Sequence, residues 1–221
     1  MSGPCLDGAR ARIARASEHL AAIEREVDAI GLSPVEHVVV GAGITGQFSR
    51  DFQAPFLISI LVGEAVYNLR AALDYLVFEL AILDSGHVAT RSQFPILRTQ
   101  KDWNRYAASL LSGVNGDHRA AIKDLQPFNG VEWTAQLRDL SNPDKHQRLV
   151  MATHGTKVTV HANASVKTHA LGSALKRPVG TKSEVSHILL FDDGLPVAGT
   201  LWKIRTGVNG AVEAFDPDFQ R

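Results

Sequence analysis

Cysteine is nearly absent from this sequence, since Cys5 is its one cysteine in 221 residues. A single thiol cannot form an internal disulfide, and it cannot supply the cysteine set of a structural zinc site. The nine histidines do not show the paired spacing that is typical of zinc ligands. We therefore expect a fold without disulfides and without a bound metal.

An excess of charge of one sign is also missing. The chain has 23 lysines and arginines and 23 aspartates and glutamates, so its formal net charge is zero. Proteins with a broad nucleic-acid-binding surface usually carry a positive excess. The composition therefore argues against such a surface, although it leaves room for a local basic patch.

Long apolar stretches are lacking as well. Residues 1–16 contain no apolar segment of the kind found in secretory signal peptides. The longest apolar run, residues 54–63, is too short to span a bilayer. The helix signal that follows it carries the charged residues Glu64, Arg70, Asp74 and Glu79. We expect a soluble cytoplasmic protein that has no membrane partner.

The sequence contains neither a P-loop nor the G-x-S-x-G motif, but residues 38–46 match the G-x-G-x-x-G dinucleotide pattern. Glu64 follows about twenty residues later, where the pattern places an acidic residue. Residues 47–52 are too polar and irregular for the helix that must follow the glycines. A glycine-rich hairpin or bulge is therefore the favoured interpretation. Dinucleotide binding through Gly41 to Gly46 is a distant alternative, and we expect no cofactor.

The strongest pattern that is present is a helix signal over residues 55–83. Apolar residues recur there at spacings of three and four, at Val62, Val66, Leu69, Leu73, Leu76, Val77, Leu80 and Leu83. This spacing predicts a long, buried central helix. Shorter helix signals cover residues 6–30, 101–111, 117–125, 133–140 and 144–151. Asn142 and Pro143 fit the N-cap and the first position of the last of these helices.

The character of the sequence changes after residue 153. Alternation predicts strands at residues 157–167, 184–192, 199–206 and 211–215, with hairpin signals at 192–194 and 208–210. Residues 36–52 are expected to add a strand or hairpin. This segregation of helices and strands is typical of an α+β fold. We predict one domain, residues 1–221, with a helical bundle over about 5–151 and a small antiparallel sheet over about 154–216.

The central helix also carries polar residues that are candidates for a binding site. Arg70 and Asp74 lie four residues apart on one face and can form an ion pair, and Asn68 lies on a neighbouring stripe. These residues could hold a small anion or a partner. The favoured interpretation of the pair is structural, because ion pairs within helices are common and usually structural or solvated.

A second polar group lies at the predicted helix start near residue 142. It combines Asn142, Lys145 and His146 with Arg138 upstream. A helix N-terminus binds anions, so Arg138 and this terminus could hold a phosphodiester while His146 transfers a proton. The alternative, which we favour, is a capped helix start in which His146 is structural.

Four landmarks carry a family resemblance, namely GEAVYNLRAALDYL at residues 63–76, QFPI at 93–96, LQPF at 125–128 and NPDKH at 142–146. In combination they resemble a widespread family of uncharacterised bacterial proteins, over about residues 60–150. This resemblance implies no particular activity.

The helical part is also similar, more loosely, to the HEPN superfamily of small helical bundles, which includes metal-independent ribonucleases. Their signature is an arginine, a short spacer and a histidine, and Arg138, residues 139–145 and His146 resemble it. The resemblance implies that Arg138 and His146 would serve RNA cleavage, often in a homodimer whose two motifs face each other.

Two functions of different class follow from these observations. The first is a non-catalytic binding or interaction protein with an unknown ligand or protein partner, and the zero net charge favours it. The alternative is a HEPN-like ribonuclease, with RNA as the partner, His146 and Arg138 as catalytic residues and a homodimer as the assembly.

Overall fold

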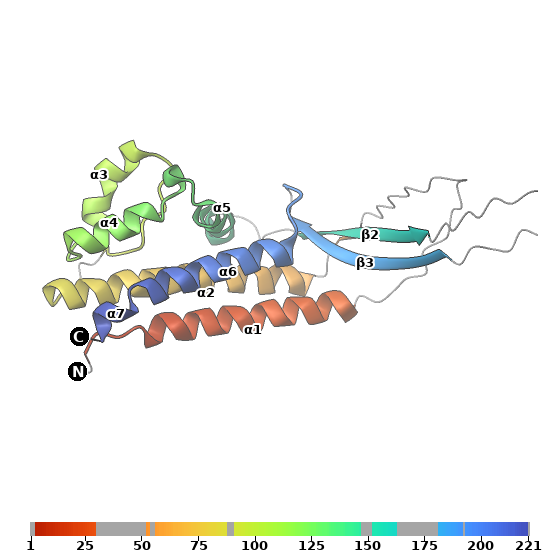
Figure 1. The fold of residues 1–221 in the computed structure, drawn as a ribbon, viewed down its shortest axis with the longest axis horizontal. Coiled ribbons are helices and arrows are strands. Elements are labelled where there is room, and N and C mark those ends of the chain that lie inside the picture. The colour runs from red at the N-terminus through yellow and green to blue at the C-terminus, as the bar shows by residue number, and fades with distance from the viewer. Residues whose placement is uncertain are drawn as a thin grey trace, which may run out of the picture.

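The computed structural model describes residues 3–29, 52–53, 56–87, 91–146, 152–162, 181–191 and 193–220 (Figure 1). Its helices are α1 (Asp7–Ala29), α2 (Phe56–Ser85), α3 (Gln100–Leu110), α4 (Gly116–Asp124), the 3₁₀ turn η1 (Pro127–Asn129), α5 (Glu132–His146), α6 (Val197–Ala214) and α7 (Asp216–Phe219). Its strands are β1 (Phe52–Gln53), β2 (Ala152–Ala162) and β3 (Thr181–Phe191).

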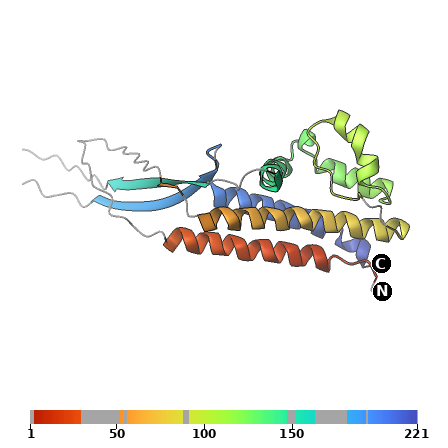
Figure 2. The ribbon, with the colours of Figure 1, turned by 180° about the vertical axis from the view of Figure 1, so that it is seen from behind.

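The centre of the molecule is a bundle in which α1, α2 and α6 lie side by side (Figures 1 and 2). Gly8 lies against Tyr75 and His19 contacts Glu64, so α1 and α2 run antiparallel. The helix α5 packs on α2 and α6. The α3–α4 unit, which we define as residues 91–131, lies over the end of the bundle where α2 and α6 finish (Figure 1).

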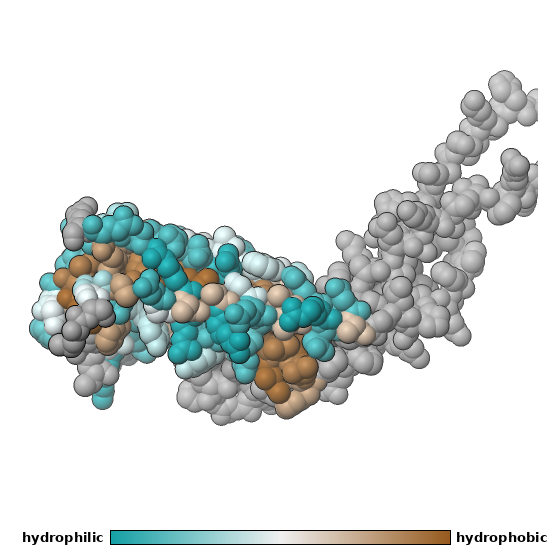
Figure 3. All heavy atoms as spheres, turned by 90° about the horizontal axis from the view of Figure 1, so that it is seen from below, coloured by the Kyte–Doolittle hydropathy of each residue, from teal (hydrophilic) through white to brown (hydrophobic). Residues whose placement is uncertain are grey.

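The central helix α2 confirms the prediction from apolar spacing. Its side chains on the predicted face are fully buried, including Val62, Val66, Leu69, Leu73, Leu76, Val77 and Leu80. Among the described residues, α2 is long and apolar enough to cross a bilayer, but 56% of its most apolar stretch is buried. Seen from the α1 side, much of the described surface is hydrophilic (Figure 3). Both findings are compatible with a soluble protein.

The helix α6 corrects the expected strands at residues 199–206 and 211–215 and the hairpin at 208–210. All three segments form one continuous helix. Its buried side chains recur at helical spacing, at Val197, Leu201, Ile204, Val208, Ala211 and Val212. Gly207 and Gly210, two of its three glycines, had indicated turns, but a helix interior accepts glycine at a cost of about 1 kcal/mol when packing compensates. The Trp133 ring of α5 lies directly on Gly207, where a Cβ atom would overlap it.

The β-structure is smaller than the predicted sheet. The strands β2 and β3 pair antiparallel from Ala152 opposite Phe191 to Ala162 opposite Thr181. The short strand β1 pairs with the start of β2. Because residues 197–214 are helical, the α+β prediction and the strand-rich boundary at 154–216 are wrong for this part of the chain. The described part of the chain is a helical bundle with a three-stranded antiparallel sheet in the order β1-β2-β3. Residues 36–51 of the expected hairpin lie outside the described residues.

The helix α5 also differs from the prediction of two helices at residues 133–140 and 144–151. It runs without a break from Glu132 to His146. Thr134, Leu137 and Ser141 form its buried side, and Ser141 lies within the expected break. Asn142 is therefore not an N-cap, and the predicted helix N-terminus at Pro143 does not exist in the structure.

Candidate functional site

The predicted pair of Arg70 and Asp74 is present on α2. The Arg70 Nη2 atom lies 3.1 Å from the Asp74 Oδ1 atom and also donates to the Phe94 carbonyl oxygen. The Phe94 N–H donates to the same Asp74 oxygen at 2.9 Å. Burial lowers the pKa of Arg70, partly offset by the charge of Asp74. The pair therefore fastens the loop around Phe94 to the central helix, which supports the structural interpretation.

The same loop is fastened a second time by Gln126, a fully buried side chain. Its Nε2 atom donates to the carbonyl oxygens of Pro95 and Ile122, at 2.9 and 3.0 Å. Its Oε1 atom accepts from the Leu97 N–H at 2.9 Å. Three of the four sequence landmarks, around residues 63–76, 93–96 and 125–128, therefore meet in one structural unit.

Asn68 is buried between α1 and α2. Its Nδ2 atom donates to the Glu64 carbonyl oxygen at 2.8 Å, and its Oδ1 atom accepts from Arg12 at 3.2 Å. The Arg12 guanidinium also lies over the rings of Tyr67 and Tyr75, at 5.9 and 5.5 Å. Asn68 thus joins two helices of the bundle, and it does not line the cleft described below.

Arg138 and His146 lie on one helix, α5, eight residues apart. This places them about 12 Å apart along the helix axis and about 80° apart around it. The Arg138 Nη1 atom is buried without a hydrogen-bond partner and lies 3.7 Å from Asp139. Asn142, Lys145 and His146 fall in the last turns of α5, and their side chains lie outside the described part. Their catalytic and binding roles stay predictions, but the anion site at a helix start is wrong.

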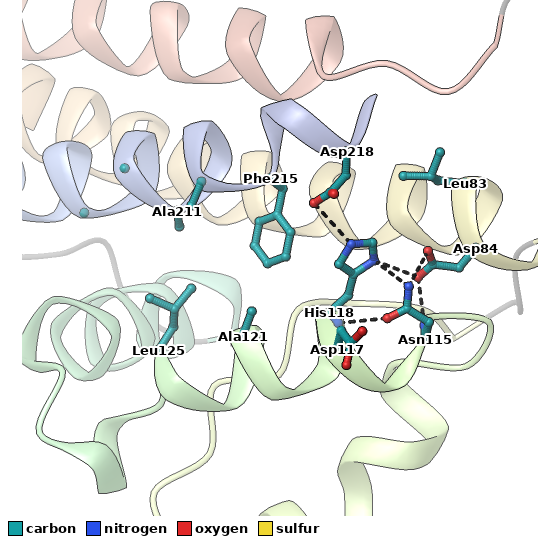
Figure 4. A pocket seen from close by; sticks show the side chains of 13 residues that line it. Leu83, Asp84, Asn115, Asp117, His118, Ala121, Leu125, Ala211, Phe215 and Asp218 are labelled. Carbon is teal, nitrogen blue, oxygen red and sulfur yellow. Dashed lines mark hydrogen bonds and ion pairs between the residues drawn. The ribbon is translucent and has the colours of Figure 1, made fainter. Parts of the chain in front are cut away.

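A cleft lies between α4 and the C-terminal half of α6, next to α7 and the end of α2 (Figure 4). Its volume is about 820 Å³, within the range of small-molecule sites. Its lining residues are Leu83, Asp84, Asn115, Asp117, His118, Ala121, Leu125, Gly207, Gly210, Ala211, Ala214, Phe215 and Asp218. The small residues of α6 leave the space that larger side chains would fill.

His118 is at the centre of the polar part of this cleft. Its Nδ1 atom lies 2.9 Å from an Asp84 oxygen, and its Nε2 atom lies 3.3 Å from an Asp218 oxygen (Figure 4). The Phe215 ring meets the imidazole edge-on at 5.6 Å. A neutral imidazole has one N–H, so only the doubly protonated ring donates to both carboxylates. The site therefore brings together α2, α4 and α7 around one imidazole.

Asn115 explains why α4 begins where it does. It is the N-cap, and its Oδ1 atom accepts from the His118 N–H at 2.9 Å. The Asp84 carboxylate accepts from the Asn115 backbone N–H at 2.7 Å and from its Nδ2 atom at 2.8 Å. The start of α4 is therefore tied to the end of α2, and His118 is held in a fixed position one turn into the helix.

Sequence reasoning had assigned no function to His118. The two carboxylates that face it come from residues 34 and 100 positions away in the chain. No periodic pattern links positions so far apart. The cluster depends on how α2, α4 and α7 meet in space.

The lining of the cleft has a one-sided charge. Three carboxylates line it, those of Asp84, Asp117 and Asp218, and its described lining residues include no lysine or arginine. The same described residues include no Ser, Thr or Cys, which with Lys are the commonest nucleophiles of enzymes. In the described ranges, no cluster of three His, Cys, Asp or Glu residues could hold a metal ion.

Comparison of the chain with family models, curated proteins and solved structures finds no match.

Proposed function

We propose that this chain is a non-catalytic binding protein whose ligand is a small organic cation held in the cleft between α4 and α6. The observation that carries the proposal is the charge of the lining, which combines three aspartates with no lysine or arginine. An amine or a quaternary ammonium group is attracted by such a lining.

The contacts of each aspartate indicate which of the three carboxylates bind the ligand. Both Asp84 oxygens accept hydrogen bonds from Asn115 or His118, so this carboxylate mainly holds the site together. Asp117 lies exposed in the first turn of α4, and Asp218 lies opposite it on α7 with its side chain 30% exposed. We assign the ligand's charged groups to Asp117 and Asp218, with the apolar side chains of Leu125 and Phe215 contacting its hydrocarbon part.

The surroundings of His118 favour binding over catalysis. A general base needs a ring nitrogen that can accept a proton from the substrate. In this cleft each nitrogen of His118 already faces a carboxylate oxygen. His118 therefore contacts two aspartates and helps to position them.

The test is calorimetric titration of the full chain with putrescine as the dication probe and succinate as a dianion of similar length. We expect saturable putrescine binding, no succinate binding, and at least a tenfold loss of putrescine affinity in Asp117→Asn and Asp218→Asn. A tenfold loss corresponds to about 1.4 kcal/mol. Asp124→Asn is the matched control, because Asp124 is an exposed aspartate at the other end of α4 and does not line the cleft. Equal affinities in all four proteins would contradict the proposed site.

A further inference from the structure

The C-terminal helix α7 is held by two different parts of the molecule. Asp216 accepts a hydrogen bond from Arg10 of α1, whose guanidinium also pairs with Glu213 at 3.2 Å. Asp218, two residues later, contacts His118 of α4. One short helix thus joins the bundle to the α3–α4 unit at the edge of the cleft (Figure 4).

The α3–α4 unit is anchored separately to α2. The Asp84–Asn115 hydrogen bonds fix the start of α4, and Gly113 lies close to Ser85 and Ala81. On the other side of the cleft, His118 reaches Asp218 and the Phe215 ring. The α3–α4 unit is therefore attached to α2 by hydrogen bonds and to α7 by an ion pair.

We propose that α7 is a clasp that closes this cleft, and that separation of Asp218 from His118 opens it. The inference rests on the cleft being the ligand site proposed above. A ligand amine that pairs with Asp218 competes with His118 for the same carboxylate. Ligand binding and opening of the clasp are therefore coupled. A change that weakens the contact between Asp218 and His118 favours the contact between Asp218 and the ligand, and the reverse also holds.

The first experiment follows amide hydrogen exchange of the full chain without ligand. We expect faster exchange in α4 in Asp218→Ala and in Asp216→Ala than in wild type, because each change removes one attachment of α7. A roughly two- to fivefold effect matches the loss of a partly exposed ion pair. Asp124→Ala is the control, and unchanged exchange in α2 shows that each variant is folded. Wild-type exchange in α4 of both clasp variants overturns the proposal.

A second experiment separates this inference from the ligand proposal. Asp216 does not line the cleft, so Asp216→Ala should bind putrescine with a faster association rate and retain its contacts with the ligand. Faster exchange in α4 of Asp216→Ala, without putrescine binding, would support the clasp and contradict the proposed class of ligand. Putrescine binding with wild-type exchange and a wild-type association rate in Asp216→Ala would retain the site and reject the clasp.

Discussion

Arg70 shows what a single buried cation does in this bundle. Its side chain is 11% exposed, and its partners are the Asp74 carboxylate and the Phe94 carbonyl oxygen. Burial lowers its pKa, yet arginine starts so far above neutrality that the guanidinium stays charged. Its removal would take a charged donor away from the Phe94 carbonyl oxygen and from the Asp74 carboxylate, which the Phe94 N–H also contacts.

We expect Arg70→Ala to lower the free energy of unfolding by about 3 kcal/mol, the lower end for breaking a buried ion pair, because Asp74 is partly exposed. Arg98→Ala is the control, since Arg98 pairs with Asp139 on the surface at 2.6 Å and should cost less than about 1 kcal/mol. Urea denaturation followed by circular dichroism measures both losses. Similar losses would show that Arg70 is not the buried anchor of the loop.

At the scale of the element, α6 is the helix whose secondary structure depends most on packing against other elements. Gly207 and Gly210 both lie within it, but they have different surroundings. The Trp133 ring occupies the position of a Cβ atom at Gly207, whereas nothing lies within 4 Å of that position at Gly210. Gly207 therefore makes room for the Trp133 ring, whereas no neighbouring atom requires a glycine at position 210.

This difference predicts opposite effects of the same substitution. Gly207→Ala should lower stability by about 1–3 kcal/mol, because overpacking against Trp133 outweighs the gain in helix propensity. Gly210→Ala should raise stability by up to about 1 kcal/mol, since alanine favours a helix over glycine. Thermal unfolding with matched protein concentrations gives both values. If residues 208–210 formed a hairpin turn, Gly210→Ala would instead be destabilising.

At the scale of the whole molecule, the ends of distant segments meet around the α3–α4 unit. The last residues of the chain contact α1 through Arg10 and α4 through His118. The cleft between these parts has an acidic lining, and the proposed function rests on that lining. A cleft lined in this way repels the phosphates of a nucleic acid.

From the proposed non-catalytic function we expect no cleavage when the full chain is incubated with a mixed RNA pool in EDTA, and no difference between wild type and His146→Ala. Gel analysis of the RNA is the measurement, with circular dichroism to show that both proteins are folded. Cleavage by wild type that disappears in a folded His146→Ala variant would instead establish the HEPN-like ribonuclease, with His146 in its active site.

The sequence alone was sufficient where one helix face determines the structure. The spacing of Leu69, Leu73, Leu76 and Leu80 predicted α2, and the four-residue spacing of Arg70 and Asp74 predicted their contact. The lone cysteine excluded an internal disulfide. The two helix inferences need only local geometry, because a helix places residues three or four positions apart on the same side. The disulfide inference needs only the number of cysteines.

Tertiary structure decided the rest. The α6 segment contains valines, threonines and glycines that locally favour strands and turns, and its packing against α1, α2 and the Trp133 ring makes it a helix. The polar part of the cleft forms because Asp84, His118 and Asp218, which are distant in the chain, meet between the end of α2, the start of α4 and α7. Burial of apolar surface over a whole helix outweighs local propensities of less than about 1 kcal/mol per residue, and a contact between distant residues leaves no local pattern to detect.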